Sequence, residues 1–328
     1  MAIGLVISYS LFFSSSVKLQ EKSKLIYIHT GWNIEQVEQM LSEKHIISHS
    51  LGFKIFAKYK HYDDGVIPGR YRVMNGMSNA ELVNMLVKGH QEQESISLHN
   101  IIFKGDLAGI MGSKMESDSA KVMEALNNGP FLKQFGVNPT NVLAIFIPGT
   151  YKMYWTDSPE MFITQMDSNY KKFWSKERRA KAAKAGLSPM QVTILASIVQ
   201  GEQCLHMDEK PIIAGLYINR LKRNMPLQSD PTLVYARGDF SIQRVLEGDK
   251  QLDSPYNTYK HVGLPPGPIN MPEPSSIDAV LDYNVNDYLY MCAEADGSGR
   301  THFCKTLEEQ NKYAVKYREY LNKRQISR

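Results

Sequence analysis

The apolar positions along the first 90 residues predict a small module of strands and helices. Asn33 followed by Gln36, and Ser78 followed by Glu81, are capping boxes, each typical of a helix N-terminus. Apolar residues recur at helical spacing after each box, whereas runs rich in β-formers next to turn residues predict strands. The expected elements are a strand at 25–28, a helix after Asn33, a helix at 51–59, a strand at 70–73 and a helix from Ser78 to Gly89.

The middle of the chain has a weaker pattern. We expect a strand near 96–103, a helix near 119–126 and an apolar run at 142–147. A long helix is expected from Ser158 to Gly186. Because both signs of charge alternate in its second half, that half is expected to be a solvated face.

A helix that begins after Ser188 carries the first candidate for chemistry. Ser188 and Gln191 form a third capping box. Glu202 lies four residues after Ile198, so a continuous helix places its carboxyl group on the apolar face. Burial there would raise the pKa of the carboxyl group toward the range useful for proton donation. The alternative is that Gly201 ends the helix and leaves Glu202 exposed.

Three segments after this helix combine polar, aromatic and rigid residues. They read LQSDPT at 227–232, SPYNTY at 254–259 and GLPPGPI at 263–269. Aromatic faces beside amide and hydroxyl groups suit a sugar polymer, because the rings stack on the pyranose face and the polar groups bind its hydroxyls. Paired prolines hold such a loop at low entropic cost. Each segment by itself is also compatible with an ordinary loop.

Composition narrows the class of protein. With 328 residues, 43% of them hydrophobic, the chain is long enough for two domains. The net charge of +4 is too small to indicate a nucleic-acid partner, although it is compatible with an anionic polymer. Cys204, Cys292 and Cys304 exclude a disulfide framework and have no zinc-site spacing.

The uncharged run at 2–13 predicts the end of a membrane anchor. It is shorter than the roughly 20 residues that cross a bilayer, and a polar stretch follows it. A weak signal peptide and a buried strand are the alternatives.

The sequence resembles the YceG-like family, the MltG-type endolytic murein transglycosylases. The resemblance rests on long, collinear motifs between Leu195 and Lys312: ASIVQGE, AGLYINRLKRNMPLQSDPT, SPYNTY, GLPPGPI, YLYM and GRTHFCKTLEEQNK. It implies an α+β fold in which a small LysM-like βααβ-type module precedes a mixed α/β catalytic domain. The implied boundaries are 1–16 for the remnant of the anchor, 24–90 for the module and 96–328 for the catalytic domain.

The resemblance also implies a site. The family's catalytic glutamate ends a run of the type S-I-V-E-K-E, which here reads SIVQGE and assigns that role to Glu202. Many relatives have a second glutamate where this chain has Gln200, and the FKGD segment at 103–106 departs from the family's E-G pair. Neither a metal nor an organic cofactor is implied. The candidates for holding glycan or orienting Glu202 are Gln228, Ser229, Asp230, Asn257, Tyr259 and His302.

The implied reaction is cleavage between N-acetylmuramic acid and N-acetylglucosamine with formation of a 1,6-anhydro ring. The expected setting is the bacterial cytoplasmic membrane, crossed once, with the catalytic domain on the cell-wall side. Peptidoglycan strands are the expected partner, and a peptidoglycan synthase (a penicillin-binding protein) is a second. Three alternatives remain: a muramidase with Asp230 as second carboxylate, a non-catalytic scaffold for synthases, and a metalloenzyme using Glu202, His206 and Asp208.

Overall fold

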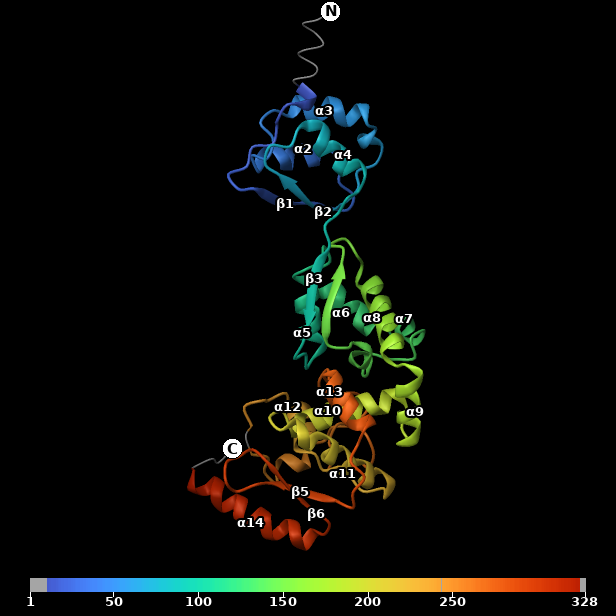
Figure 1. The fold of residues 1–328 in the computed structure, drawn as a ribbon, viewed down its shortest axis with the longest axis vertical. Coiled ribbons are helices and arrows are strands. Elements are labelled where there is room, and N and C mark those ends of the chain that lie inside the picture. The colour runs from blue at the N-terminus through green and yellow to red at the C-terminus, as the bar shows by residue number, and fades with distance from the viewer. Residues whose placement is uncertain (1–10, 243, 325–328) are drawn as a thin grey trace, which may run out of the picture. The chain divides into compact units, whose positions relative to one another are not determined.

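The computed structural model describes the chain except residues 1–10, 243 and 325–328, and it divides into two compact units (Figure 1). Unit 1 comprises the chain up to Ile96 together with Gly109–Val122 and Thr150–Phe162. Unit 2 comprises Ser97–Ala108, Met123–Gly149 and the chain from Ile163 onward. The expected anchor at 1–16 lies mostly outside the described residues.

Unit 1 contains the five elements that the sequence predicts for its first 90 residues. Strands β1 (Ser23–Ile28) and β2 (Gly69–Met74) pair antiparallel, with Ser23 opposite Met74 and Ile28 opposite Gly69. Three helices lie on one side of this pair (Figure 1). They are α2 (Ile34–Glu43), α3 (Ser50–Tyr59) and α4 (Asn79–Val87). The β1–α2–α3–β2 order agrees with the expected βααβ arrangement.

Local sequence determines where the helices of unit 1 begin. The capping boxes at Asn33 and Ser78 are both formed, with the side chain accepting from the backbone of Gln36 and Glu81 respectively. The apolar residues behind them pack into one core with the inward residues of the strands. That core includes Ile26, Ile28, Val37, Leu41, Phe53, Tyr71, Leu82 and Val83.

The middle of the chain differs from the prediction in two places. The expected strand at 96–103 is shorter and earlier, as β3 (Glu94–Leu98), and α5 (Lys104–Gly112) begins close after it. The apolar run at 142–147 forms a 3-10 turn at Val142–Ile145 before β4 (Gly149–Met153), which pairs with β3. Helix α6 (Ser119–Asn127) is where it was expected, and α7 (Gly129–Lys133) follows it.

The second difference is the long helix expected after Ser158, which is two helices in the structure. They are α8 (Pro159–Phe173) and α9 (Lys176–Lys184). The break occurs because Trp174 is buried in the core and Ser175 caps a new helix by accepting from the backbone nitrogen of Arg178. Most of α9 is exposed, as its mixed charges predict.

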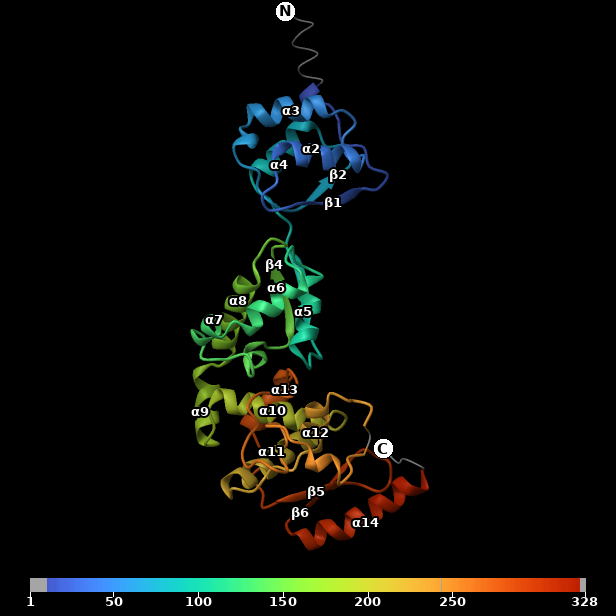
Figure 2. The same ribbon diagram turned by 180° about the vertical axis from the view of Figure 1, so that it is seen from behind.

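Unit 2 is built round α10 (Pro189–Glu202), which packs against α11 (Lys210–Lys222) and α13 (Pro274–Leu281) (Figure 2). Leu195, Ile198 and Tyr217 belong to its buried core. Strands β5 (Tyr290–Ala293) and β6 (Thr301–Cys304) pair antiparallel and contact α14 (Leu307–Lys323). The short helix α12 (Asp230–Arg237) begins beside the end of α10.

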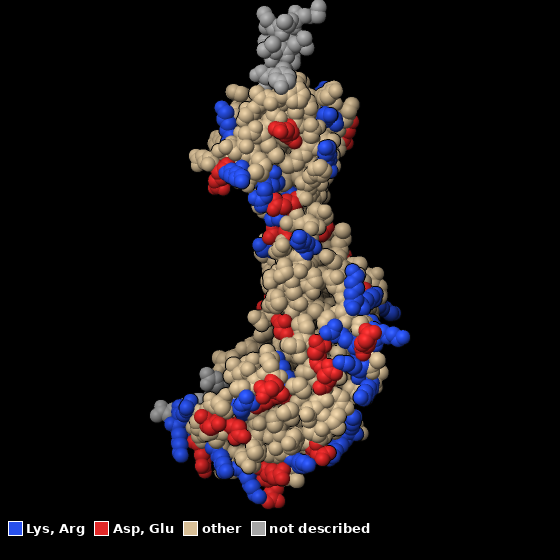
Figure 3. Space-filling view, viewed as in Figure 1, with Lys and Arg blue, Asp and Glu red and all other residues tan. Residues whose placement is uncertain are grey.

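This mixture of helices and small antiparallel pairs confirms the predicted α+β class. On the face in Figure 3, basic and acidic side chains are interspersed. Within the described residues, no single helix is both long and apolar enough to cross a bilayer. One bent pair, α9 with α10, passes the same length and composition test only when the two helices are taken together.

Candidate active site

Glu202 is the last residue of α10. The capping box at Ser188 is formed, and the helix runs without interruption to Glu202 before the chain becomes extended at Gln203. Ile198, one turn earlier on the same face, is completely buried. The alternative in which Gly201 ends the helix is therefore wrong, and the periodicity places the carboxyl group where the sequence predicts.

Two hydroxyl groups bind the carboxylate of Glu202. The Tyr217 hydroxyl from α11 and the Ser229 hydroxyl from the loop before α12 each donate to Oε1, both at 2.5 Å. Tyr217 is 1% exposed and Ser229 is completely buried, so both donors are fixed by packing. Within the described part of the chain, Oε2 has no hydrogen bond, which leaves this oxygen for another group.

Burial determines the protonation of Glu202. Desolvation raises its pKa to about 7, against the opposing effects of the hydrogen bonds from Ser229 and Tyr217. The neighbouring Asp230 carboxylate raises the pKa further, and the Arg220 guanidinium lowers it. A carboxyl group with a pKa near neutrality can give and then retake a proton, which suits a general acid and base.

Arg220 holds the loop that carries Ser229. Its guanidinium is 4% exposed and donates to the carbonyl oxygens of Pro226 and Leu227, both at 2.9 Å. It also donates to the side-chain oxygen of Gln228 at 3.1 Å and to the carbonyl of Leu289 at 2.6 Å. Because a buried carbonyl without a hydrogen bond costs free energy of folding, these hydrogen bonds from the guanidinium fix the path of the loop.

Thr258 fixes the same loop from the other side. Its carbonyl accepts from the backbone nitrogen of Gln228, and its hydroxyl accepts from the nitrogen of Ser229, both at 3.0 Å. Gln228 adopts φ of 53°, a left-handed conformation that is uncommon for a residue other than glycine. These two bonds hold that turn and aim the Ser229 hydroxyl at Glu202.

Gly201 allows the end of α10 to approach α12 closely. A β-carbon at this position would lie 2.8 Å from the Cβ atom of Pro231, which directly follows Asp230. The absence of a side chain therefore brings Glu202 and the start of α12 together.

Asp230 and Tyr259 form a second pair beside Glu202. The Tyr259 hydroxyl donates to the Asp230 carboxylate, while desolvation raises the pKa of Asp230 although the residue retains exposed surface. The carboxylates of Asp230 and Glu202 interact electrostatically. The structure thus brings Ser229, Asp230 and Tyr259 together around Glu202, while the Gln228 side chain binds Arg220.

The other two predicted site residues have different surroundings. Asn257 is completely buried, and its amide donates to the carbonyls of Lys250 and Leu252 at 2.9 and 2.7 Å. Its side chain therefore holds the 250–259 loop together. His302 lies in β6, where its ring contacts Glu294 at 3.1 Å and stacks on Tyr313.

The metalloenzyme alternative is not supported by the placement of its three residues. The His206 ring contacts the carbonyl of Ser298 at 2.8 Å, and Asp208 pairs with Arg300 at 3.0 Å, while Glu202 binds hydroxyl groups. Among the residues that the structure describes, no group of three or more His, Cys, Asp or Glu side chains could hold a metal ion.

Gln200, two residues before Glu202 on α10, has a structural role. Its side-chain oxygen accepts from the backbone nitrogen of Glu273 and from the hydroxyl of Ser276, at 2.8 and 3.0 Å. The amide thus ties α10 to the start of α13.

Sequence reasoning missed Tyr217, Arg220 and Thr258 as members of the site. Tyr217 was counted only as part of the apolar face of its helix. The available signal was the position of a tyrosine and an arginine three residues apart on that helix, next to the LQSDPT segment.

Comparisons with known proteins identify the family of the chain. The model of the YceG-like family matches residues 26–316. The chain is 29% identical to the endolytic murein transglycosylase of Bacillus subtilis, with 89% of this chain and 84% of that protein covered. It is 26% identical to the protein of the same name from Streptococcus pneumoniae serotype 2, with 97% of this chain and 63% of that protein covered.

Among solved structures, the chain is similar to a yceG-like protein of Listeria monocytogenes. The TM-score is 0.57 at 28% identity, with 89% of this chain and 98% of that chain covered.

Proposed function

The chain belongs to the YceG-like family, and on that premise we propose that it is a lytic transglycosylase that cleaves the glycan strands of peptidoglycan. Two relatives that match most of this chain are named endolytic murein transglycosylases. The observation that carries the proposal is the Glu202 carboxyl group, whose pKa burial raises to about 7. A single carboxyl group that titrates there can serve as the acid and afterwards as the base.

In the first step, Glu202 protonates the glycosidic oxygen between N-acetylmuramic acid and N-acetylglucosamine. The bond from C1 of the muramyl residue to that oxygen breaks, and the N-acetylglucosamine leaves with the proton. Glu202 becomes a carboxylate. Because Oε1 is bound by Tyr217 and Ser229, we assign the proton transfer to Oε2.

In the second step, the Glu202 carboxylate takes the proton from the C6 hydroxyl of the same muramyl residue. The C6 oxygen then bonds to C1 and closes a 1,6-anhydro ring. The proton returns to Glu202, so the enzyme ends in its starting form and water is not a reactant. The two hydroxyl donors stabilise the carboxylate between the steps.

The muramidase alternative has one observation in its favour, the Asp230 carboxylate next to Glu202. A hydrolase with two carboxyl groups would use Asp230 to activate water. In the proposed reaction, Asp230 and its partner Tyr259 help to hold glycan and raise the pKa of Glu202. A scaffold that only recruits synthases would need neither the half-buried acid nor its two hydroxyl donors.

The proposal extends to the setting of the enzyme. We place it on the cell-wall side of the bacterial cytoplasmic membrane, tethered by its N-terminus, with a LysM-like module before the catalytic domain. We also propose that it cleaves within strands and acts together with a peptidoglycan synthase, as the resemblance to the family implies.

Digestion of purified peptidoglycan, with products identified by mass spectrometry, tests the proposal. We expect the wild-type chain to release anhydro-muramyl ends and Glu202→Gln to release none. Glu308→Gln, which alters an exposed carboxylate on α14, is the matched control and should behave as wild type. Asp230→Asn should still form anhydro ends. Reducing ends from the wild type, lost in Asp230→Asn, would establish the hydrolase instead.

A further inference from the structure

Helix α3 of unit 1 has apolar side chains on two sides. Its inward side belongs to the core of the unit and includes Phe53 and Ala57. Its outward side carries Leu51, Ile55 and Tyr59, which are 60%, 44% and 72% exposed. Because these three residues are spaced four apart, they form one stripe along the helix. A surface helix places polar residues there, and a contiguous exposed apolar patch indicates an interaction surface.

The uncharged N-terminal run ends against this helix, and its first described residues lie beside α3 (Figure 1). The rings of Phe12 and Phe13 lie 5.4 and 6.3 Å from that of Phe56, measured between centroids. Phe13 is 54% exposed, so its ring extends the apolar surface of α3. Residues 2–10, which directly precede this segment, include no charged side chain.

Lysines border the stripe. From Lys44 to Tyr62 the chain contains four lysines and no acidic residue. Lys54, Lys58 and Lys60 lie on α3 or directly after it, and all three are exposed. Lys54 pairs with Glu38 of α2 at 2.9 Å. An apolar stripe with lysines along its edge suits a layer that is apolar inside and negatively charged at its surface.

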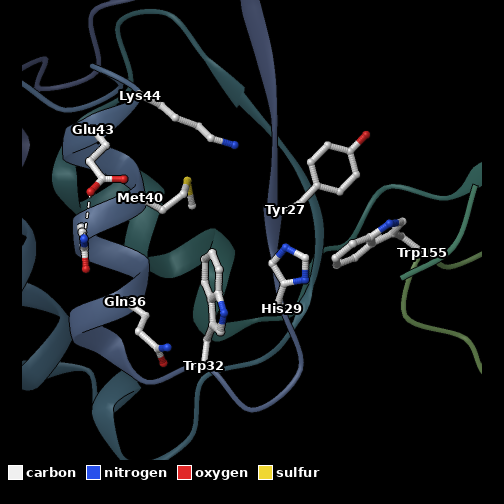
Figure 4. A pocket seen from close by; sticks show the side chains of 9 residues that line it. Tyr27, His29, Trp32, Gln36, Met40, Glu43, Lys44 and Trp155 are labelled. Atoms are coloured by element: carbon white, nitrogen blue, oxygen red, sulfur yellow. Dashed lines mark hydrogen bonds between the residues drawn. The ribbon is translucent and has the colours of Figure 1, made fainter. Parts of the chain in front are cut away.

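The aromatic rings beside β1, by contrast, have a partner within unit 1. Figure 4 shows Tyr27 and His29 next to Trp155, which comes from the segment after β4. The Trp155 ring lies 5.0 Å from that of Tyr27 and 4.9 Å from that of His29, between centroids. The stripe on α3 stays exposed in the part of the chain that the structure describes.

We propose that the stripe on α3 and the adjoining Phe13 ring form a surface that lies in the interface of an anionic lipid bilayer. The apolar side chains enter the boundary between headgroups and acyl chains, and the lysine side chains extend to the negatively charged headgroups. The presence of a bilayer rests on the proposed setting of the enzyme. The new element is a second contact with it, made by a folded helix in addition to the tether.

The charges favour lipid over a second copy of this chain as the occupant. Two copies that dock through the same surface would bring the lysines of one α3 next to those of the other. Like charges that face each other disfavour such a dimer, whereas anionic headgroups neutralise them.

Fluorescence quenching by brominated lipids tests this surface. The full chain is mixed with vesicles of phosphatidylethanolamine and phosphatidylglycerol whose acyl chains carry bromine, which quenches tryptophan at short range. Tyr59→Trp adds a reporter on the stripe, and Lys24→Trp adds one at an exposed position of β1 as the control. Subtraction of the wild-type signal removes the native tryptophans.

The measurement is made at a lipid concentration at which the whole chain sediments with the vesicles, so that quenching reports where α3 lies. Because an interfacial helix lies at the boundary with the acyl chains, we expect about half of the added fluorescence of Tyr59→Trp to be lost. The added fluorescence of Lys24→Trp should be unchanged.

Matched variants locate the contact. Leu51→Ser together with Ile55→Ser changes two exposed residues and should abolish the quenching of Tyr59→Trp. Leu307→Ser together with Val315→Ser on α14, which are 52% and 46% exposed, is the matched control and should leave it unchanged. Circular dichroism of each variant shows whether the chain is folded.

The lysines give a second test that leaves the stripe intact. Lys58→Gln together with Lys60→Gln changes only exposed side chains and should reduce the quenching of Tyr59→Trp on vesicles that contain phosphatidylglycerol. On vesicles of phosphatidylcholine alone, the same variant should behave as the chain with both lysines. Equal quenching on both kinds of vesicle, with and without the lysines, would contradict their role.

The other outcomes separate this surface from its rivals and from the proposed reaction. Equal quenching of Tyr59→Trp and Lys24→Trp would overturn the surface and leave the tether alone, and a chain that does not sediment with vesicles would overturn both. Self-association without lipid, abolished by Leu51→Ser with Ile55→Ser, would also overturn it and identify a second copy as the occupant. Digestion of purified peptidoglycan involves no lipid, so failure to form anhydro ends contradicts the proposed reaction and leaves the membrane surface supported.

Discussion

At Glu202, burial and two hydroxyl groups act on one carboxyl group in opposite directions. Desolvation raises its pKa to about 7, while the Tyr217 and Ser229 hydroxyls favour the charged form. The acid must be protonated to donate, so the rate should fall as the pH rises through about 7. A pH–rate profile of the wild type measures this fall in rate, which forms the alkaline limb of the profile.

Removal of one hydroxyl should shift that limb. Tyr217→Phe and Ser229→Ala each lose a donor that lowers the pKa of Glu202, so the alkaline limb should move to higher pH. The rate constant kcat should fall about tenfold, because the carboxylate loses a hydrogen bond. Tyr283→Phe, on the surface of the same core, is the control. A limb that moves to lower pH would contradict the account.

The raised pKa of Glu202 also affects stability. An unfolded glutamate ionises near 4.5, so between that pH and about 7 the folded state holds a proton that the unfolded state has released, and stability falls as the pH rises. Glu202→Gln removes this loss. The free energy of unfolding of the variant minus that of the wild type should be larger at pH 8 than at pH 4, by up to about 3 kcal/mol. Urea unfolding at both pH values measures the difference, and an equal effect at both would contradict burial of the acid.

At the level of elements, the site depends on how the loop at 226–230 is attached to α11. Arg220→Ala leaves the carbonyls of Pro226, Leu227 and Leu289 without their donor, so we expect a loss of about 3 kcal/mol in the free energy of unfolding and a large fall in kcat. Arg223→Ala, an exposed arginine at the end of the same helix, should change neither. Denaturant unfolding and activity assays of the two variants measure both effects, and equal stability and kcat in the two would contradict the role of Arg220.

The contact between α10 and α12 gives a second prediction at this scale. Gly201→Ala improves helix propensity but places a methyl group against Pro231, so the loop carrying Ser229 must move. Activity should fall about tenfold or more, the effect expected when a positioned group is displaced. Gly109→Ala in α5, where a β-carbon meets open space, is the matched control. Equal activity in the two variants would show that the close approach is not needed.

Local signals predicted some of these features and long-range packing determined the others. The capping box at Ser188 and the apolar spacing placed Glu202 on α10, because both depend on residues within one helix. The break at Ser175 could not be predicted from the sequence, since it depends on the burial of Trp174 in the core. The same holds for Tyr217, whose hydroxyl meets Glu202 only because α10 and α11 pack together.

On the scale of the whole molecule, the acid, its hydroxyl donors and all six candidates placed by motif lie in unit 2. Ser229 binds Glu202, Asp230 and Tyr259 interact with it electrostatically, and Gln228 binds Arg220. Asn257 is buried in its loop and His302 lies in β6. Which of them touches glycan depends on tertiary structure that no single motif contains.

Digestion of peptidoglycan in ¹⁸O-labelled water distinguishes ring closure catalysed by Glu202 from attack by water. We expect the wild-type chain to release muramyl ends in the anhydro form that contain no ¹⁸O, and Glu202→Gln to release no anhydro ends. Reducing muramyl ends that carry ¹⁸O at C1, in excess of those that exchange with water in the Glu202→Gln digest, would contradict ring closure, because hydrolysis places an oxygen from water at C1.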